Sequence, residues 1–401
     1  MPFRRAWQET RGLSPAFWLV FVATLINRTG TMVLPFLVLY LTRALGMSGS
    51  RAAFVMATWG VVALVASPLM GRLSDRVGAM RLMKILMVLT GLFLLAYLAV
   101  STFAGVVVVT TAASFANEGF RPLIPTVVAQ VVPADRLKSA FAVSRLATNL
   151  GMAIAPVVGG LLADHDIVLL FWVDGGTSLL AALVLIAGTR KGWPAKKPSA
   201  PRAARGGDGP WLFADARLRL CFLATFPIAV VFLQHNSSFA LFMVDKLKLT
   251  AVDYGIVSSI NPVLIVLLEV PLATALAHWS YRRTLTLGAF LVAVGFGALA
   301  FVDGVFGAAA GLVIWTFGEM LTLPQLNAYV TEVAPEARRG EALGYYMMIW
   351  SLASSVGPWL GIQGLEYIGA ARMWTAAMLF GLTALFATLR LREPDPVAVT
   401  V

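Results

Sequence analysis

The sequence predicts an all-α polytopic membrane protein with twelve transmembrane helices, and three observations support this. Only 13% of the 401 residues are charged, whereas soluble domains carry about 25%. Hydrophobic residues make up 59% of the chain. Long stretches without any charged residue recur, for example over residues 52–70 and 86–115, and they are long enough to cross a bilayer. A large soluble core is the alternative, but soluble helices keep a polar face that most of these stretches lack.

Twelve spans follow one another along the chain, with one long polar segment after the sixth. The predicted spans cover residues 14–42, 51–71, 82–101, 104–132, 138–163, 167–189, 218–245, 253–278, 284–302, 305–333, 341–364 and 370–390. We therefore expect an N-terminal six-helix bundle over residues 1–190, a linker over 191–217 and a C-terminal six-helix bundle over 218–401. The linker is rich in Lys, Arg, Pro and Gly, which suits either a solvated connection or a contact with anionic membrane lipids.

The distribution of Lys and Arg predicts the orientation in the membrane. Most of the 31 basic residues fall on the side of the predicted N-terminus, so the positive-inside rule places both termini in the cytoplasm and the protein in the cytoplasmic (inner) membrane of a bacterial-type cell. The net charge of +11 does not indicate nucleic acid binding, because these charges concentrate in short loops. The first hydrophobic run is too long for a signal peptide and is expected to be the first span.

An internal repeat relates the two halves. Five residue pairs are separated by a constant offset of 202, namely Pro122 and Pro324, Pro133 and Pro335, Arg136 and Arg338, Pro156 and Pro358, and Gly159 and Gly361. Two repeated bundles related by a pseudo-two-fold axis, with a site between them, are typical of transporters.

A short charged segment lies between the second and third spans, with Gly71, Asp75, Arg76, Gly78 and Arg81 as its distinctive residues. The glycines permit a tight turn and close helix approach, and the aspartate can bind an arginine or a helix N-terminus. A merely topological basic loop is the alternative. The pattern resembles the signature loop of the major facilitator superfamily, which implies alternating access and a cytoplasmic gate. The equivalent loop of the second half, residues 278–283, has no aspartate, so the latch is expected in the first half only.

The fifth span contains a second motif, with Gly151, Ala155, Pro156, Gly159 and Gly160 at helical spacing. It resembles the antiporter motif of the 12-span drug:proton antiporter family, which has a glycine in place of the alanine. The resemblance implies export. Close packing by small residues, which is common in membrane helices, is the alternative.

Ionisable residues inside the spans are the candidates for function, because each costs about 2.5–3.5 kcal/mol at a helix centre. They are Arg28, Glu118, Arg121, Asp174, His235, Glu269 and Glu319. We expect Glu319 to be the proton-coupling carboxylate, since its surroundings resemble the tenth span of multidrug antiporters. Glu118 and then Glu269 follow. A structural partner is the alternative for Glu319, and a local ion pair with Arg121 for Glu118. Asp174 and His235 are open between functional and interfacial roles.

Polar residues of the first and seventh spans, Asn27, Arg28, Gln234, His235 and Asn236, are expected to line a substrate cavity. Aromatic residues suit an amphipathic organic cation. The aromatic candidates are Trp315, Tyr346 and Trp350, with Tyr329 and Tyr345 as further members. Lipid-facing positions are the alternative for each of them.

These observations predict a secondary transporter, and the family resemblance favours proton-coupled efflux of lipophilic or cationic drugs. Proton-coupled uptake of a small nutrient or peptide is one alternative, and a non-transporting membrane sensor is another. An enzyme is not expected, because no nucleophile–base, metal or phosphate-loop pattern is found. The single cysteine, Cys221, and three distant histidines favour no metal site. We expect no cofactor, a proton gradient as energy source, and a monomer.

Overall fold

The computed structural model describes residues 13–133, 136–190, 192–193, 212–335 and 338–394. Within these ranges the regular elements are helices, as predicted. The chain divides into two compact units. Unit 1 comprises Met1–Arg202 with Thr250–Val266, and unit 2 comprises Ala203–Leu249 with Leu267–Val401. Most of the predicted linker and the basic N-terminus lie outside the described residues.

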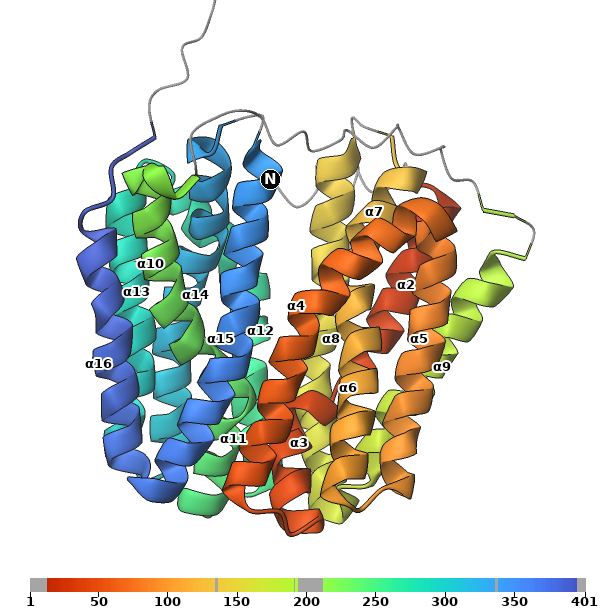
Figure 1. The fold of residues 1–401 in the computed structure, drawn as a ribbon, viewed down its shortest axis with the longest axis horizontal. Coiled ribbons are helices and arrows are strands. Elements are labelled where there is room, and N and C mark those ends of the chain that lie inside the picture. Colours follow the sequence, from red (N-terminus) through yellow and green to blue (C-terminus); the bar gives the residue numbers. More distant parts are fainter. Residues whose placement is uncertain (1–12, 134–135, 191, 194–211, 336–337, 395–401) are drawn as a thin grey trace, which may run out of the picture. The chain divides into compact units, whose positions relative to one another are not determined.

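Unit 1 is built from helices that pack side by side, most of them long. They are α2 (Pro15–Gly30), α3 (Val33–Leu39), α4 (Gly49–Val77), α5 (Ala79–Ala96), α6 (Phe103–Phe120), α7 (Leu123–Val131), α8 (Leu137–Asp166) and α9 (Leu169–Gly188). The hydroxyl groups of Ser14, Ser48 and Thr102 accept N–H bonds at the starts of α2, α4 and α6, which explains why these helices begin there. Helix α2 packs on α8 and α9, and α6 packs on α4 and α5 (Figure 1).

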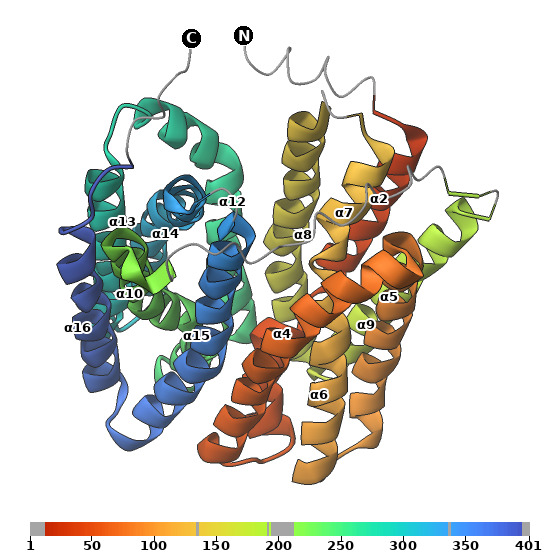
Figure 2. The same ribbon diagram turned by 45° about the horizontal axis from the view of Figure 1, so that its top comes forward.

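Unit 2 follows the same plan. Its helices are α10 (Ala216–Phe232), α11 (Ser238–Leu241), α13 (Tyr281–Ala298), α14 (Val305–Val333), α15 (Arg339–Tyr367) and α16 (Ala370–Thr388), and α12 (Ala251–Ala275) begins in unit 1 and ends in unit 2. Helix α13 packs on α14 and α16, and α10 packs on α15 and α16 (Figure 2). Small residues permit close approach of α13 and α14, since a Cβ on Gly318 would lie 2.8 Å from the carbonyl oxygen of Gly288.

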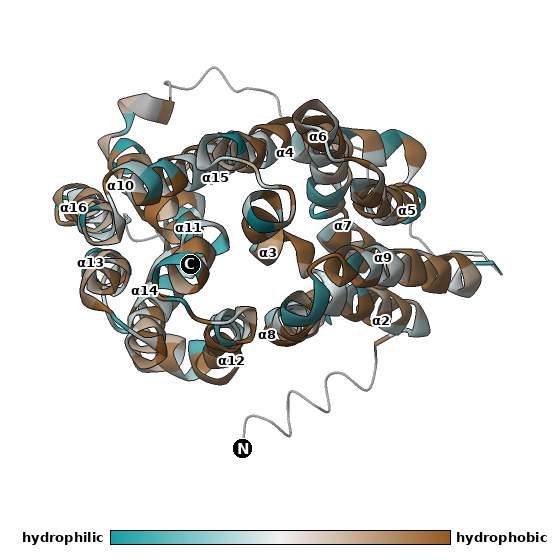
Figure 3. Ribbon diagram, turned by 90° about the horizontal axis from the view of Figure 1, so that it is seen from below, coloured by the Kyte–Doolittle hydropathy of each residue, from teal (hydrophilic) through white to brown (hydrophobic). Residues whose placement is uncertain are grey.

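Twelve helical spans run through the described residues. Eleven of them are long and apolar enough to cross a membrane, and hydrophobic residues, drawn in brown, are frequent along the helices in Figure 3. The remaining one, α15, has 29 residues and contains more polar side chains, including Ser351, Ser354 and Ser355. The prediction of an all-α polytopic membrane protein is therefore confirmed.

The structure changes one detail of the predicted loop after the second span. Helix α4 continues to Val77, so Gly71 lies inside the helix and a Cβ there would meet open space. Only Gly78 turns the chain, with φ at +92° and its N–H bonded to the carbonyl oxygen of Ser74 at 2.9 Å. The helix extends because the charged residues of this segment prefer solvent but do not oppose helical geometry.

A local ion pair marks the start of α10. The side chain of Asp215 accepts hydrogen bonds from the backbone N–H of Arg217 at 2.8 Å and from its Nη2 at 3.1 Å. Partial burial of Asp215 favours the neutral acid, but the bonds from Arg217 outweigh this and hold the pKa of the carboxyl below its ordinary value. The stabilisation is therefore present at neutral pH and is lost only as the pH falls through that lowered pKa.

Candidate functional site

The first span is broken in the middle, and a buried acid holds the break. Helix α2 ends at Gly30 and α3 begins at Val33. From α9, Asp174 accepts hydrogen bonds from the backbone N–H groups of Met32 at 3.2 Å and Val33 at 3.0 Å. Its side chain is buried. Asp174 thus caps α3 and satisfies backbone N–H groups that the break leaves without helical partners. Broken spans of this kind are typical of the binding sites of transporters.

Arg28 lies in the last turn of α2, directly before this break. Its guanidinium stands 5.8 Å from the ring centroid of Phe120, within electrostatic range of Arg121, Glu118 and Asp174. Its Nε is buried and, among the described residues, has no hydrogen-bond partner. The guanidinium therefore keeps hydrogen-bonding capacity at the broken span.

Asn27, the residue before this arginine, is held in place on one side only. Its Nδ2 donates to the hydroxyl of Ser178 on α9 at 3.1 Å. Its Oδ1 is buried, and no described residue donates a hydrogen bond to it. Asn27 therefore also retains an unused acceptor next to the break.

Glu118 forms the local ion pair that its spacing from Arg121 allows. The Oε2 of Glu118 lies 3.1 Å from Nη1 of Arg121, and its Oε1 accepts the indole N–H of Trp59 at 3.1 Å. The carboxylate side chain is 9% exposed, whereas the Arg121 side chain is 65% exposed. Both residues lie in the middle of the span Phe103–Val131. The pair therefore joins a buried acid to an accessible cation at mid-span.

The glycines of the predicted antiporter motif are packing positions for the same region. A Cβ on Gly151 would lie 2.7 Å from the carbonyl carbon of Arg28, and a Cβ on Gly159 would lie 3.0 Å from the Cβ of Met32. A Cβ on Gly160 would lie 2.6 Å from the carbonyl oxygen of Ala251 on α12. Helix α8 thus contacts the residues around the break of span 1 and the start of α12. Pro156 lies within α8 between these glycines.

The seventh span is also broken, at the predicted polar cluster. Helix α10 ends at Phe232, a 3-10 turn covers Leu233–Asn236, and α11 begins at Ser238. The Nε2 of Gln234 donates to the carbonyl oxygen of Gly357 on α15 at 2.9 Å, and its Oε1 accepts from the Ser238 hydroxyl at 2.6 Å. Buried Gln234 therefore fastens the break to α15.

The other two polar residues of this turn are half-buried. His235 contacts the carbonyl oxygen of Phe232 through Nδ1 at 2.7 Å. Asn236 ends the 3-10 turn. Sequence reasoning found the polar cluster but missed both breaks. The run of helix-disfavouring Asn, Ser and Ser after His235, and Gly30 followed by Thr31, are the signals that indicate them.

Two of the predicted aromatic residues, Trp350 and Tyr346, belong to a row of rings that reaches His235 through Phe232. The ring of Phe232 is 4.7 Å from that of His235 and 6.0 Å from that of Trp350, and Trp350 is 6.4 Å from Tyr346. Trp350 is half-buried and Tyr346 is buried. These rings form an aromatic group at the break of span 7.

The other aromatic candidates are elsewhere in unit 2. Trp315 is fully buried and stacks on Phe296 at 4.1 Å, with ring planes inclined by 8°. Tyr329 is also fully buried and donates to the carbonyl oxygen of Arg392 at 2.7 Å. Tyr345 contacts Phe222. For these three side chains a role in the substrate cavity stays a prediction.

The remaining predicted carboxylates occupy unit 2. Glu319 is half-buried in α14, next to Gly318, where α14 packs on α13. Glu269 is half-buried in α12, between the strongly exposed apolar side chains of Leu267 and Val270. Glu118, by contrast, belongs to unit 1.

The predicted gating residues are at the end of α4 and the start of α5. Asp75, Arg76 and Arg81 are exposed, and none of them forms an ion pair with another described residue. The latch between Asp75 and an arginine therefore stays a prediction.

Comparison with known proteins identifies the family. The family model described as Major Facilitator Superfamily matches residues 20–358 and 221–399. The chain belongs to this superfamily. It is a multi-pass membrane transporter and not an enzyme.

Curated relatives in this superfamily share low but extended identity. An uncharacterized MFS-type transporter, YqjV of Bacillus subtilis, is 24% identical, covering 95% of this chain and 93% of its own length. Multidrug resistance protein 1 of Bacillus subtilis is 23% identical over 79% of this chain and 81% of its own. A multi-drug resistance efflux pump PmrA homolog of Lactococcus lactis is 26% identical over 37% and 38% of the two chains.

Solved structures share the fold. A POT family transporter in complex with 5-aminolevulinic acid superposes with a TM-score of 0.74 at 15% identity, covering 93% of this chain and 94% of the other. A D-xylose-proton symporter superposes with a TM-score of 0.75 at 14% identity, covering 94% and 97%. At this identity the likeness shows the architecture alone, with twelve helices in two bundles.

Proposed function

We propose that this transporter exports amphipathic small molecules across the cytoplasmic membrane in exchange for protons, by alternating access as a monomer with both termini in the cytoplasm. Two relatives named for multidrug resistance support this direction. The observation that carries the proposal is the ion pair of Glu118 and Arg121 in the middle of a span.

The pair has the properties of a proton-coupling element. Because a charge in the middle of a span costs about 2.5–3.5 kcal/mol, the 65% exposed side chain of Arg121 indicates contact with water. A proton from that water would neutralise Glu118 and release Arg121. A cationic substrate and a proton then compete for the same carboxylate oxygens, and such competition is the requirement for exchange. Glu319 and Glu269 are the further carboxylates that would take part.

Proton-coupled uptake of an anionic small molecule is the second candidate, and Arg28 favours it. The guanidinium of Arg28 has no hydrogen-bond partner at Nε among the described residues. After protonation of Glu118, Arg121 would be released as well. Two guanidinium groups then suit a carboxylate, so the proton and the substrate would bind together.

One measurement distinguishes the two candidates. Ethidium or dialanine is added outside proteoliposomes that contain a pH-sensitive dye, and no pH gradient is imposed. Exchange makes the lumen more alkaline, because a proton leaves as substrate enters, whereas co-transport makes it more acidic. We expect an alkaline change with ethidium. An acidic change with dialanine would establish uptake instead, and no change with any substrate of a wider screen would support a sensor.

Substitution of Glu118 tests whether its carboxylate couples transport to protons. Glu118→Gln keeps an oxygen for the Trp59 N–H but removes the charge that binds Arg121. We expect the lumenal pH change to disappear while ethidium exchange between equal pools persists. Glu366→Gln, at an exposed position of α15, is the matched control. Full coupling in Glu118→Gln would exclude this role and leave Glu319→Gln as the next test.

A further inference from the structure

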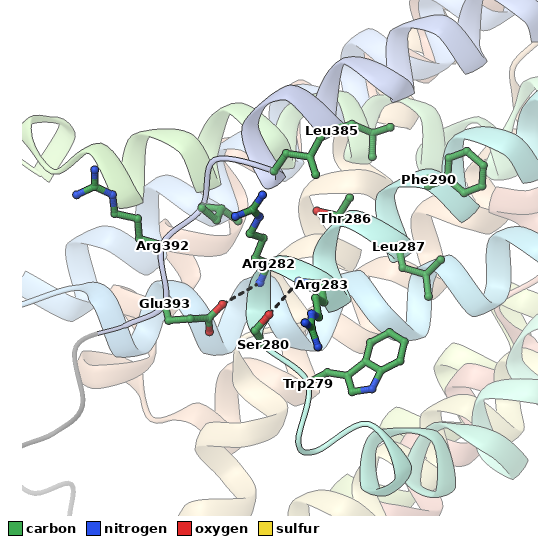
Figure 4. Close-up of a pocket in the computed structure, with 12 residues that line it drawn as sticks. Trp279, Ser280, Arg282, Arg283, Thr286, Leu287, Phe290, Leu385, Arg392 and Glu393 are labelled. Carbon is green, nitrogen blue, oxygen red and sulfur yellow. Dashed lines mark hydrogen bonds between the residues drawn. The ribbon is translucent and has the colours of Figure 1, made fainter.

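Unit 2 contains a surface pocket of about 1080 Å³ whose lining includes none of the residues of the proposed transport site. It lies where α13 begins and α16 ends, and the short segment after α16 closes one side (Figure 4). Its wall combines three arginines with a row of apolar side chains. The combination of charge at one end and apolar surface beside it indicates an amphipathic ligand.

The polar end of the pocket carries excess positive charge. Arg282, Arg283 and Arg392 are exposed, and in the part of the chain that the structure describes their guanidinium groups form no ion pair. The one acid of the pocket, Glu393, accepts hydrogen bonds from the backbone N–H groups of Tyr281 at 3.1 Å and Arg282 at 3.2 Å. Its carboxylate is thus engaged in capping α13, as Figure 4 shows for the bond to Arg282.

A buried hydroxyl without a partner lies between the charged and apolar parts. The Oγ1 of Thr286 is buried and makes no hydrogen bond within the described structure. By contrast, Thr284, two residues earlier, donates to the carbonyl oxygen of Ser280 at 3.1 Å. An unsatisfied buried hydroxyl costs stability, so a ligand that supplies an oxygen here would be favoured.

The apolar part continues along the same two helices. Leu287 and Phe290 of α13 are 37% and 44% exposed, and Leu389 next to the end of α16 is 47% exposed. Trp279 lies two residues before α13, and tryptophan is typical of the boundary between headgroups and hydrocarbon. The pocket therefore extends from that boundary into the depth of the acyl chains.

We propose that this pocket binds one anionic phospholipid. The phosphate contacts Arg282, Arg283 and Arg392, because guanidinium groups bind phosphate through charge-assisted, bidentate hydrogen bonds. An oxygen of the glycerol ester region accepts from the Thr286 hydroxyl, and an acyl chain covers Leu287. A zwitterionic lipid would leave the positive charge of the pocket, which has three arginines and one acid, uncompensated. A soluble anion would leave the apolar side chains of the wall uncovered. Basic pockets at the cytoplasmic surface commonly select anionic lipids in this way.

Native mass spectrometry of the full chain tests the proposal. The protein is delipidated, mixed with equal amounts of phosphatidylglycerol and phosphatidylcholine, and the retained lipid is counted. We expect one tightly held phosphatidylglycerol. The exchange of one pocket arginine for glutamine should weaken this binding about fivefold, since each basic residue contributes roughly that factor. The triple variant Arg282→Gln, Arg283→Gln, Arg392→Gln should lose it. Arg339→Gln, at an exposed position of the same unit outside the pocket, should retain it.

Two further variants separate a lipid from a free anion. Thr286→Val and Phe290→Ala keep all three arginines, so they should weaken lipid retention while competition by inorganic phosphate stays unchanged. Retention of phosphatidylglycerol in the triple variant would overturn the proposal, as would equal retention of phosphatidylcholine by the wild type. Equal binding of soluble glycerophosphoglycerol would show that the site takes a free anion. Thermal unfolding of each variant confirms that it is folded.

Discussion

Gly151 of α8 lies directly against the backbone of Arg28 of α2. A Cβ added at Gly151 would stand 2.7 Å from the carbonyl carbon of Arg28 and 2.9 Å from the backbone nitrogen of Thr29. No flexible side chain separates the two helices at this point. The glycine of the predicted antiporter motif thus determines how closely α8 approaches the arginine at the broken span.

Gly151→Ala should therefore destabilise the protein and reduce transport. Because the obstructing atoms are backbone atoms and the Cβ of Arg28, none of which can rotate away, α8 must shift, which costs about 1–3 kcal/mol for an overpacked position. Thermal unfolding in detergent and ethidium transport would measure the two effects. Gly176→Ala is the matched control, since a Cβ there meets nothing within 4 Å and alanine favours the helix. Equal stability of the two variants would contradict the close contact.

The sequence predicts the spans and the small residues at which helices approach closely. It does not predict which helices meet at those residues. Apolar stretches without charge reveal the spans, because a membrane requires about 20 apolar residues for each helix. The small residues at positions 151, 159 and 160 indicate close contacts. The partners of these contacts could not be predicted, because spacing along one helix does not specify which neighbour it faces. The role of Asp174 as a cap was missed for the same reason, since its partners are 141 and 142 residues away.

The break between α2 and α3 should depend on Asp174. In Asp174→Ala the N–H of Val33 loses its acceptor and the N–H of Met32 keeps only the carbonyl oxygen of Gly30 at 2.7 Å, and an unsatisfied buried group costs about 1–3 kcal/mol. We expect a large drop in the unfolding temperature. Asp166→Ala removes a similar bond, to the backbone N–H of Val168 at 2.9 Å, but from an exposed carboxylate. It should cost about 1 kcal/mol at most, and a comparable loss in both variants would show that Asp174 does not hold the break.

The first turn of α12 should be held to α8 by Asp164, whose Oδ1 accepts the backbone N–H of Ala251 at 2.9 Å. In Asp164→Ala this N–H loses its acceptor, so its hydrogen exchange should become about fivefold faster, as expected for the loss of roughly 1 kcal/mol. Hydrogen-exchange mass spectrometry of the peptide over residues 249–255 measures this. Asp303→Ala, an exposed acid in a different loop, should leave that peptide unchanged. Unchanged exchange in both variants would show that the bond is not formed in the membrane protein.

The partners of the buried carboxylates cannot be predicted from the sequence alone. Glu118 and Glu319 occupy similar places in the two halves, so the sequence offers little to separate them beyond the family resemblance. The structure supplies Trp59, whose indole N–H binds Glu118 at 3.1 Å from 59 residues away. This contact orients the carboxylate toward Arg121, and it makes Glu118 the first residue to substitute.

The break in span 7 should depend on Gln234 in the way that the break in span 1 depends on Asp174. Gln234→Leu keeps most of the side-chain volume but leaves the buried hydroxyl of Ser238 without its acceptor, at roughly 1–3 kcal/mol. It also removes the side-chain donor to the carbonyl of Gly357, which keeps its helical bond within α15. Gln325→Leu, a half-buried position of α14, is the control and should change stability little. Thermal unfolding in detergent distinguishes the two.

A double-mutant cycle with Gly361 isolates the contact itself. A Cβ on Gly361 would meet the side-chain oxygen of Gln234 and the hydroxyl of Ser238, so Gly361→Ala alone should destabilise the protein. In Gln234→Ala the obstructing amide is gone and the serine hydroxyl is free to rotate. The effect of Gly361→Ala should then shrink by at least about 0.5 kcal/mol, the size expected for residues in direct contact. Strict additivity of the two substitutions would show that Gln234 does not lie against α15 in the folded protein.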